Sequence, residues 1–240
     1  MEHRDRLWPG GYTFLYDDGL FRPSTDTFLL GAFPRLRRGM TVCELGAGTG
    51  LLSLLLLARE PELTVTGVEL QPQACALFRR TAEENGLQGR MHCLEGDLRQ
   101  GLLPPGRFRL AVANPPYFPP DAGAVAPDAA RRTARAETDC TLAQLCAAAA
   151  RALTWGGSFC LVHRPDRLAD VLEELRRVRL EPKRLRFVHH TARARPSLLL
   201  LEARLGGGVG LTVEPPLLLH GPDGGETEDV RRAYFRDKEE

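Results

Sequence analysis

The sequence predicts an α/β fold with a doubly wound, mostly parallel, seven-stranded sheet that contains one antiparallel strand. Strand-length apolar segments alternate with helix-length segments through most of the chain, which is typical of a parallel sheet covered by helices. A glycine-rich turn follows the first of these strands, where open α/β sheets bind their ligands. The last two strands, 185–189 and 197–204, are joined by a link too short for a parallel crossover, which predicts an antiparallel pair.

Composition narrows the function classes. The chain has 240 residues, which suits one α/β domain with an appendage, and its net charge of +1 gives no overall basic field for nucleic acid. Its six cysteines form no Cys-x-x-Cys pair, and we find no signal-peptide pattern, so we expect free thiols and a cytoplasmic protein. The longest apolar run, Leu51–Ala58, is far shorter than the ~20 residues that cross a bilayer.

Three parts are expected along the chain. They are an N-terminal hairpin and helix over 1–38, a main domain over 39–220, and a flexible tail over 221–240. In the first part, Tyr12–Tyr16 and Leu20–Arg22 flank an Asp-Asp-Gly turn, which predicts a hairpin. Ser24, Thr25 and Asp26 then resemble a helix cap. A peripheral strand at Leu211–Val213 precedes the tail.

Predicted strands and helices alternate regularly through the main domain. The strands cover 41–45, 63–70, 90–94, 108–113, 157–163, 185–189 and 197–204. The helices cover 51–59, 72–85, 138–153 and 167–178. Residues 118–136 are rich in Pro, Gly, Ala and Asp, which predicts a mobile loop.

The turn after the first strand carries Gly46, Gly48 and Gly50 at every second position, with Glu44 two residues ahead. Glycine lets the backbone turn sharply and lets a ligand approach it closely. The helix that follows offers free N–H groups at its start. The spacing differs from the G-x-G-x-x-G dinucleotide fingerprint. We therefore predict a nucleotide-type cradle in a Rossmann-like sheet, and the alternative is a tight turn without a ligand.

Three carboxylates fall near the ends of successive strands. Glu69 follows the glycine turn at the interval where this architecture places an acid on ribose hydroxyls. Asp97 follows the third strand and can accept from an adenine amine, or can cap the next helix. Glu44 can meet an ammonium group, or can be satisfied by the amides of the turn. The three assignments support one another because the carboxylates stand near the ends of successive strands, in the order in which a ligand along this edge of the sheet would meet them.

The sharpest signal is Asn114-Pro115-Pro116-Tyr117 at the end of the fourth strand. Two prolines fix two φ angles and remove two N–H donors, so the Asn114 amide oxygen and the Pro115 carbonyl can be held as aligned acceptors. Such a pair accepts hydrogen bonds from both N–H groups of a planar exocyclic amine and directs the lone pair of the amine nitrogen toward a methyl group. Tyr117 offers a face on which a flat base can stack. The alternative is a proline-rich turn without chemistry.

These residues resemble the class I S-adenosylmethionine-dependent amino-methyltransferases, and more narrowly the bacterial tRNA1(Val) adenine-37 N6-methyltransferases. The stretches that carry the resemblance are Ser24–Leu30, Glu44–Gly50, Glu69, Asp97, Asn114–Phe118, Arg195–Leu200 and Pro215–Leu217. The resemblance implies that Glu44, the three glycines, Glu69, Asp97 and Asn114 hold S-adenosylmethionine. It implies that Asn114, Pro115 and Tyr117 hold a flipped adenine.

The resemblance also implies an RNA partner, most simply tRNA. It implies no binding to a membrane and no metal ion. Candidate phosphate contacts are Arg131, Arg132, Arg135, Arg193 and Arg195. Solvated surface arginines are the alternative. The rival functions are a protein glutamine N5-methyltransferase, which uses the same four-residue motif, and a catalytically silent S-adenosylmethionine-binding subunit. A DNA adenine methyltransferase is disfavoured because no spare segment is large enough for a target-recognition domain. A nicotinamide-dependent oxidoreductase is disfavoured because it would need a longer glycine spacing than this turn has.

Overall fold

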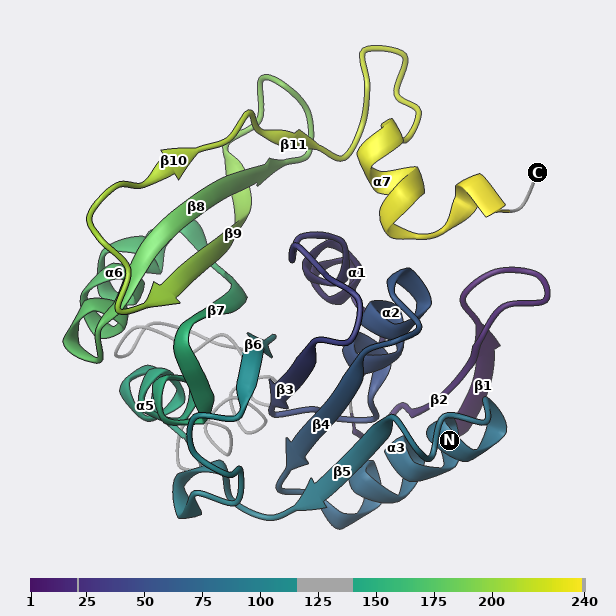
Figure 1. The fold of residues 1–240 in the computed structure, drawn as a ribbon. Coiled ribbons are helices and arrows are strands. Elements are labelled where there is room, and N and C mark those ends of the chain that lie inside the picture. Colours follow the sequence, from purple (N-terminus) through teal and green to yellow (C-terminus); the bar gives the residue numbers. More distant parts are fainter. Residues whose placement is uncertain (21, 116–139, 239–240) are drawn as a thin grey trace.

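The computed structural model describes residues 1–20, 22–115 and 140–238. Its centre is a nine-stranded sheet in the order β10-β8-β9-β7-β6-β3-β4-β5, with β11 beside β8 (Figure 1). The strands are β3 Thr41–Leu45, β4 Thr64–Glu69, β5 Met91–Glu95, β6 Phe108–Ala113, β7 Leu153–His163, β8 Leu180–His189, β9 Pro196–Leu205, β10 Thr212–Val213 and β11 Leu217–Leu218. Within this sheet β9 runs antiparallel to β7 and β8, and the other pairs are parallel. The predicted fold class is confirmed, β10 forms within the predicted peripheral strand Leu211–Val213, and β11 is a short strand that was not predicted.

The strand order reverses between β3 and β6. On one side of β3 lie β4 and then β5, and on its other side lie β6 and then β7. In open α/β sheets such a reversal leaves a crevice at the carboxyl ends of the two central strands. Glu44 of β3 lies opposite Val112 of β6, so Gly46 and Asn114, two residues further along each strand, leave the sheet side by side.

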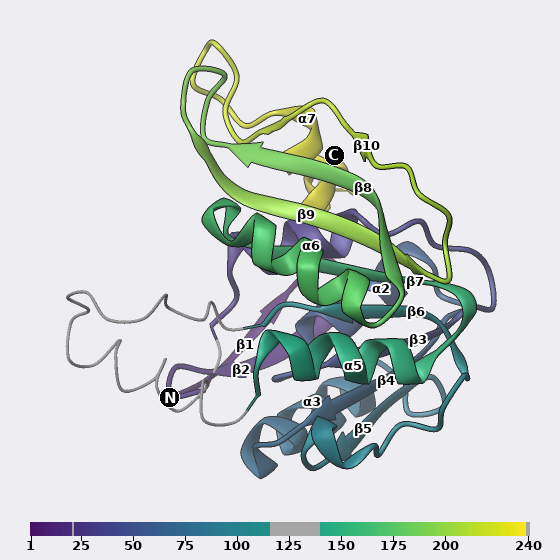
Figure 2. The ribbon, with the colours of Figure 1, turned by 90° about the vertical axis from the view of Figure 1, so that its left-hand side faces the viewer.

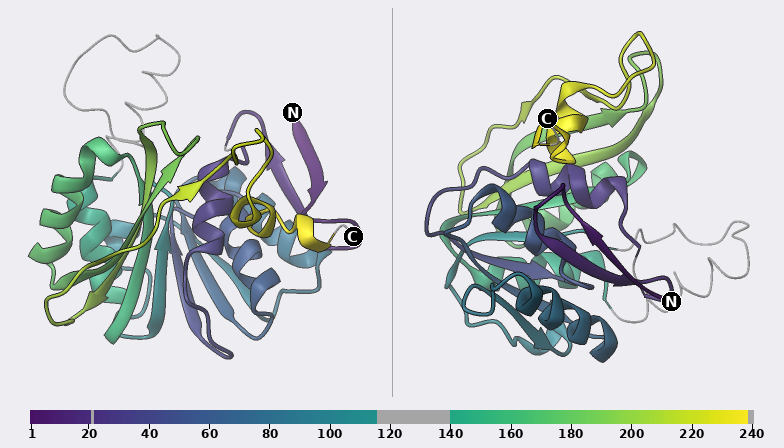
Figure 3. Two further views of the ribbon diagram at one scale, coloured as in Figure 1. Left: turned by 90° about the horizontal axis from the view of Figure 1, so that it is seen from above. Right: turned by 90° about the vertical axis from the view of Figure 1, so that its right-hand side faces the viewer.

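Helices cover both faces of the sheet. One face carries α1 Thr25–Ala32, α2 Leu51–Arg59 and α3 Pro72–Glu84, and the other carries α5 Leu142–Ala152 and α6 Leu168–Arg177. Figure 2 shows α5 and α6 in front of the sheet, and Figure 3 shows the green helices on one side and the purple and blue helices on the other. Two apolar clusters, one beneath each layer of helices, form the core.

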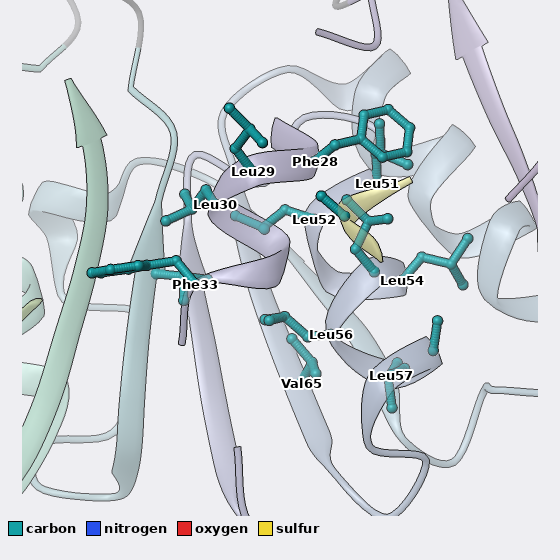
Figure 4. Close-up of a cluster of buried hydrophobic side chains, with 14 of the residues drawn as sticks. Phe28, Leu29, Leu30, Phe33, Leu51, Leu52, Leu54, Leu56, Leu57 and Val65 are labelled. Carbon is teal, nitrogen blue, oxygen red and sulfur yellow. The ribbon is translucent and has the colours of Figure 1, made fainter. Parts of the chain in front are cut away.

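Helix α2 is buried on nearly all sides because α1 covers the surface that the sheet leaves open. Residues Leu51 to Ala58 are all buried, which fits a helix that is apolar all round. Phe28, Leu29 and Leu30 of α1 pack over these leucines, and Figure 4 shows them together with Val65 of β4. Burial of each leucine stabilises the fold by about 1.5–3 kcal/mol. This packing fixes α1 relative to the carboxyl ends of β3 and β6.

The N-terminal hairpin pairs differently from the prediction. Strand β2, Thr13–Asp17, pairs with β1, Glu2–Arg6, upstream of it. The expected pairing of Tyr12–Tyr16 with Leu20–Arg22 is therefore wrong. The Asp-Asp-Gly turn does form, with the Gly19 N–H donating to the Asp17 side chain at 2.7 Å. Of the residues expected to pair with β2, the two that the structure describes, Leu20 and Arg22, belong to no strand, and Pro23 restricts the chain after them.

Several side chains attach the hairpin to α3, and Asn85 at the end of the helix makes the most backbone bonds. Asn85 Oδ1 accepts from the Thr13 N–H at 2.8 Å, and Asn85 Nδ2 donates to the Thr13 carbonyl at 2.6 Å. The same Nδ2 donates to the Thr81 carbonyl at 2.6 Å. The amide thus completes a strand-like pair of bonds between two segments far apart in the sequence.

The C-terminal segment is more ordered than the predicted flexible tail. It forms α7, Glu228–Ala233, in which Val230 and Ala233 are buried. The Tyr234 ring stacks on Phe28 of α1 with centroids 4.2 Å apart, and its hydroxyl lies 3.1 Å from Thr25 Oγ1. The helix was not predicted because it is short and mostly charged, so its few apolar residues show no helical periodicity.

Candidate active site

The glycine turn is tied to the neighbouring strand β4. The N–H groups of Gly46 and Ala47 both donate to the Val68 carbonyl at 3.0 Å. Gly46 has a φ of 73°, in the region that favours glycine, and a Cβ built on it would meet nothing within 4 Å. The turn therefore borders open space that a ligand can enter. A Cβ on Gly67 of β4 would lie 2.6 Å from the Ala47 Cβ, so this unpredicted glycine is what allows the turn to pack there.

Glu69 lies against the turn, as its position at a strand end predicts. Its Oε2 accepts from the Gly48 N–H at 2.8 Å, and its Oε1 accepts from the Gln71 N–H at 2.9 Å. The residue is 8% exposed. Two backbone amides fix the carboxylate, and each of its oxygens keeps a second acceptor site for a hydroxyl. Leu70, the next residue, is exposed and offers an apolar surface beside it.

Glu44 lies beneath the turn and bonds within the fold. Its Oε2 accepts from the Ser53 N–H at 3.0 Å and from the Ser53 hydroxyl at 2.5 Å, so it links β3 to the first turn of α2. Burial raises the pKa of Glu44 to about 8, although the Ser53 bonds oppose this shift. The carboxylate is therefore satisfied by Ser53 of α2 rather than by the amides of the turn, and contact with an ammonium group stays a prediction.

Asp97 caps a short 3-10 helix, η1 Leu98–Gln100. Its Oδ1 accepts from the Arg99 N–H at 2.8 Å, and the Arg99 guanidinium beside it lowers the pKa of the carboxyl. Next to it, η1 and α5 enclose a cavity of about 350 Å³ whose lining is mainly apolar, with Val68 and Leu98 among its residues. The capping role is present, and acceptance from an adenine amine stays a prediction.

Asn114 is oriented by a residue that motif reasoning did not single out. Its Nδ2 donates to the hydroxyl oxygen of Thr27 at 2.9 Å, and Ser24 Oγ lies 3.2 Å from the same oxygen. Thr27 is 2% exposed. This bond holds the amide nitrogen against α1, and the use of the amide oxygen and the Pro115 carbonyl as paired acceptors stays a prediction. Tyr117 and Pro116 lie outside the described residues.

A second polar residue that the motifs did not reveal is His163, at the carboxyl end of β7. Ala113 pairs with Leu161, so Pro115 leaves β6 opposite His163. The histidine is fully buried, its Nδ1 accepts from the Arg164 N–H at 2.8 Å, and burial lowers its pKa to about 4. A neutral imidazole therefore stands beside the Asn-Pro segment at neutral pH.

Two of the five predicted arginines can be placed. Arg193 and Arg195 are exposed in the link between β8 and β9, at the edge where β3 and β6 also end. Arg131, Arg132 and Arg135 lie outside the described residues. Among the residues that are described, no group of three or more His, Cys, Asp or Glu is arranged to hold a metal ion. Nor does any described helix combine the length and apolar character needed to cross a membrane.

Comparison with known proteins agrees with this geometry. The profile described as "Methyltransferase small domain" matches residues 23–181, about two thirds of the chain. The chain belongs to this methyltransferase family. The match includes the glycine turn, Glu69, Asp97 and Asn114, and it confirms the resemblance inferred from the sequence.

This methyltransferase is 32% identical to the "tRNA1(Val) (adenine(37)-N6)-methyltransferase" of Yersinia enterocolitica over 182 residues, which cover 73% of this chain and 71% of the relative. The protein of that name from Yersinia pestis is 33% identical over 160 residues, 64% of each chain. This alignment spans just under two thirds of the second relative.

Solved structures agree on the fold. A protein of Agrobacterium tumefaciens described as a predicted O-methyltransferase superposes with a TM-score of 0.72 and 21% identity over 87% of this methyltransferase and 96% of its own chain. The geranyl diphosphate C-methyltransferase of Streptomyces coelicolor superposes with a TM-score of 0.55 and 14% identity, over 74% of this methyltransferase and 75% of its own chain. At such identities the likeness supports the fold alone.

Proposed function

We propose that this methyltransferase transfers a methyl group from S-adenosylmethionine to the N6 amine of an adenine in tRNA, next to the anticodon. The observation that carries the proposal is the Asn114 side chain, whose nitrogen is held by Thr27 at the end of the strand that pairs with the one leading into the glycine turn. The Yersinia relatives, named for this reaction on tRNA1(Val), support the choice of substrate. A tRNA substrate implies a cytoplasmic enzyme.

The residues around the turn fit the cofactor. The open space at Gly46, with Gly48 and Gly50 in the same turn, accommodates the methionine part of the molecule. Glu69 accepts from the ribose hydroxyls through the acceptor sites that its two amide bonds leave. Leu70 and the apolar cavity beside Asp97 suit a flat purine ring. Glu44 supports the turn from below through Ser53.

Positioning carries most of the reaction on the amine side. The bound cofactor supplies an activated methyl group on a sulfonium. Asn114 Oδ1 and the Pro115 carbonyl accept the two N–H bonds of the adenine amine, which holds its nitrogen in line with that methyl group. The methyl group would pass from the sulfur to this nitrogen, the nitrogen would give up one proton to solvent, and S-adenosylhomocysteine would leave. Tyr117, by its place in the motif, stacks on the base. The arginines at the same edge, Arg193 and Arg195, contact phosphates.

Tritiated-methyl transfer to separated tRNA, rRNA, DNA and protein fractions tests the proposal. The label is expected in tRNA as N6-methyladenine, and Asn114→Ala should abolish it while the affinity for S-adenosylmethionine changes by roughly threefold at most, since only the amine contact is lost. Label in protein as N5-methylglutamine would replace the proposal with the rival enzyme. Absence of label in all four fractions, with cofactor binding retained, would favour the silent subunit.

Glu69→Ala tests the cofactor side. Loss of the ribose contacts should weaken S-adenosylmethionine binding roughly tenfold or more by calorimetry. Glu69→Gln is the matched control for the backbone amides, because it keeps one oxygen for the Gly48 N–H. Unchanged affinity in Glu69→Ala would remove this residue from the cofactor site.

A further inference from the structure

A second cavity lies at the edge of the sheet opposite the candidate active site. Its volume is about 550 Å³, and it is bordered by the residues that lead into β3 and β6, by the start of β7 and by the end of β9. Six of its thirteen lining residues are arginines: Arg35, Arg37, Arg38, Arg107, Arg109 and Arg204. In a chain whose net charge is only +1, this is a strong local concentration of positive charge.

Little of this charge is neutralised. Glu202 is the one acidic residue of the lining, and it already accepts from Arg184 at 2.5 Å and from the Ser158 hydroxyl at 3.0 Å. Arg38 pairs with the exposed Glu62 at 3.3 Å, and Arg35 lies 4.0 Å from Glu214.

Four arginines of the lining have no carboxylate partner within the described parts of the chain. They are Arg37, Arg107, Arg109 and Arg204. Arg204 uses its Nε to bond the Gly156 carbonyl at 2.9 Å, which leaves the rest of its guanidinium available. Each guanidinium carries donors in a fixed fork that matches the oxygens of a phosphate group.

One wall of the cavity comes from an irregularity in β7. Leu153 pairs with Phe108, but the next pair joins Ser158 to Leu110, so residues 154–157 bulge away from the sheet. The bulge carries Thr154, whose hydroxyl oxygen is buried and has no hydrogen-bond partner among the described residues. A hydroxyl that can donate to an anion thus adds to the arginines.

We propose that this cavity binds a compact polyphosphate anion, such as the phosphate chain of a nucleotide. The arginines come from three separate segments around a concave site, which suits a small ion with several phosphate oxygens better than it suits an extended backbone. The volume falls within the usual range for small-molecule sites, roughly 300–1,000 Å³. The six residues of β6 place the cavity about 20 Å from Asn114, so this site is separate from the proposed methyl transfer.

Titration of inorganic tripolyphosphate into the full chain, at roughly 50 mM salt to limit screening, tests the proposal. One binding event per chain is expected. The double variant Arg107→Ser/Arg109→Ser should weaken it roughly tenfold or more, because two charge-assisted contacts are lost. The matched control is Arg4→Ser/Arg6→Ser, which removes the same charge from the exposed strand β1 and should change the affinity by less than about twofold.

Absence of binding, or an equal loss in both double variants, would overturn the proposal. Titration with unfractionated tRNA separates the two sources of phosphate. If tripolyphosphate does not bind but the Arg107/Arg109 variant loses tRNA affinity, the cavity contacts RNA backbone and the proposal fails. Both double variants should bind S-adenosylmethionine as the unaltered chain does, so failure at this cavity is distinguishable from failure of the proposed function.

Discussion

At the scale of single residues, the site depends on bonds that orient groups rather than on groups with unusual reactivity. The Asn-Pro-Pro-Tyr motif and Glu69 could be identified from the sequence because each stands at the end of an apolar strand. The role of Thr27 could not, although it lies in a stretch that carries the family resemblance, because it is 87 positions from Asn114 and nothing in the sequence indicates that the two side chains meet. The same holds for Ser53, which takes up the Glu44 carboxylate.

Thr27→Val should lower kcat about five- to tenfold, because the Asn114 amide loses a hydrogen bond worth about 1 kcal/mol and can rotate. Valine keeps the shape of the buried side chain. Thr27→Ser, which keeps the hydroxyl, should restore most of the rate. The measurements are kcat and KM in tRNA methylation, with melting temperature as a check on the fold. Equal rates for the valine and serine variants would show that the bond does not position Asn114.

The stability of the protein should fall as pH rises between about 6.5 and 8. Glu44 has a folded-state pKa of about 8 against 4.5 in the unfolded chain, so the folded state binds the extra proton in this range. His163, with its pKa lowered from 6.5 to about 4, has the opposite effect only below pH 6.5. Denaturant unfolding should show a slope of at most about 1.4 kcal/mol per pH unit that is absent in Glu44→Gln. An identical slope in that variant would exclude Glu44 as its source.

At the scale of elements, the regular alternation was predictable and the exceptions had local causes. Helix α2 and strand β6 have the predicted bounds, because an unbroken apolar segment ends at a clear turn in each. Strand β1 was missed because its five residues, Glu2–Arg6, are all polar or charged and show no apolar alternation. The predicted strand 157–163 begins at Leu153, because the bulge interrupts its pattern.

Asn85→Ala should destabilise the fold by about 1–3 kcal/mol, because the Thr13 amide and carbonyl lose their partner in a half-buried setting. Glu83→Ala, an exposed change near the end of the same helix, is the control and should stay within about 0.5 kcal/mol. Chemical denaturation measures both. A loss no greater than that of the control would mean that the other contacts of the hairpin, such as the bond of the Leu15 N–H to Thr81, hold it without Asn85.

At the scale of the whole molecule, opposite edges of one sheet carry different polar surfaces. The edge with Asn114 was predictable because its residues belong to motifs. The basic cavity was not, because Arg35, Arg107 and Arg204 are brought together only by the strand order. The abundance of arginine along the chain also concealed it.

Binding of tRNA should weaken steeply with salt if Arg193 and Arg195 contact phosphates. Replacing both with serine should reduce the slope of log K against log salt by about 2, since each phosphate contact contributes about 0.9. The variant should lose affinity equally for different tRNA sequences. Filter binding across a salt series measures the slope, and an unchanged slope would exclude this link from the RNA interface.

The stacking of Tyr234 on Phe28 has a consequence for biosynthesis. The tyrosine hydroxyl meets Thr25 from 209 positions further along the chain, and Thr25 begins the helix that orients Asn114. A nascent polypeptide emerging from the ribosome would contain every glycine and carboxylate of the candidate active site before it contained Tyr234, which holds that helix through Phe28 and Thr25. Competence for methyl transfer would therefore be acquired only after Tyr234 has been synthesised.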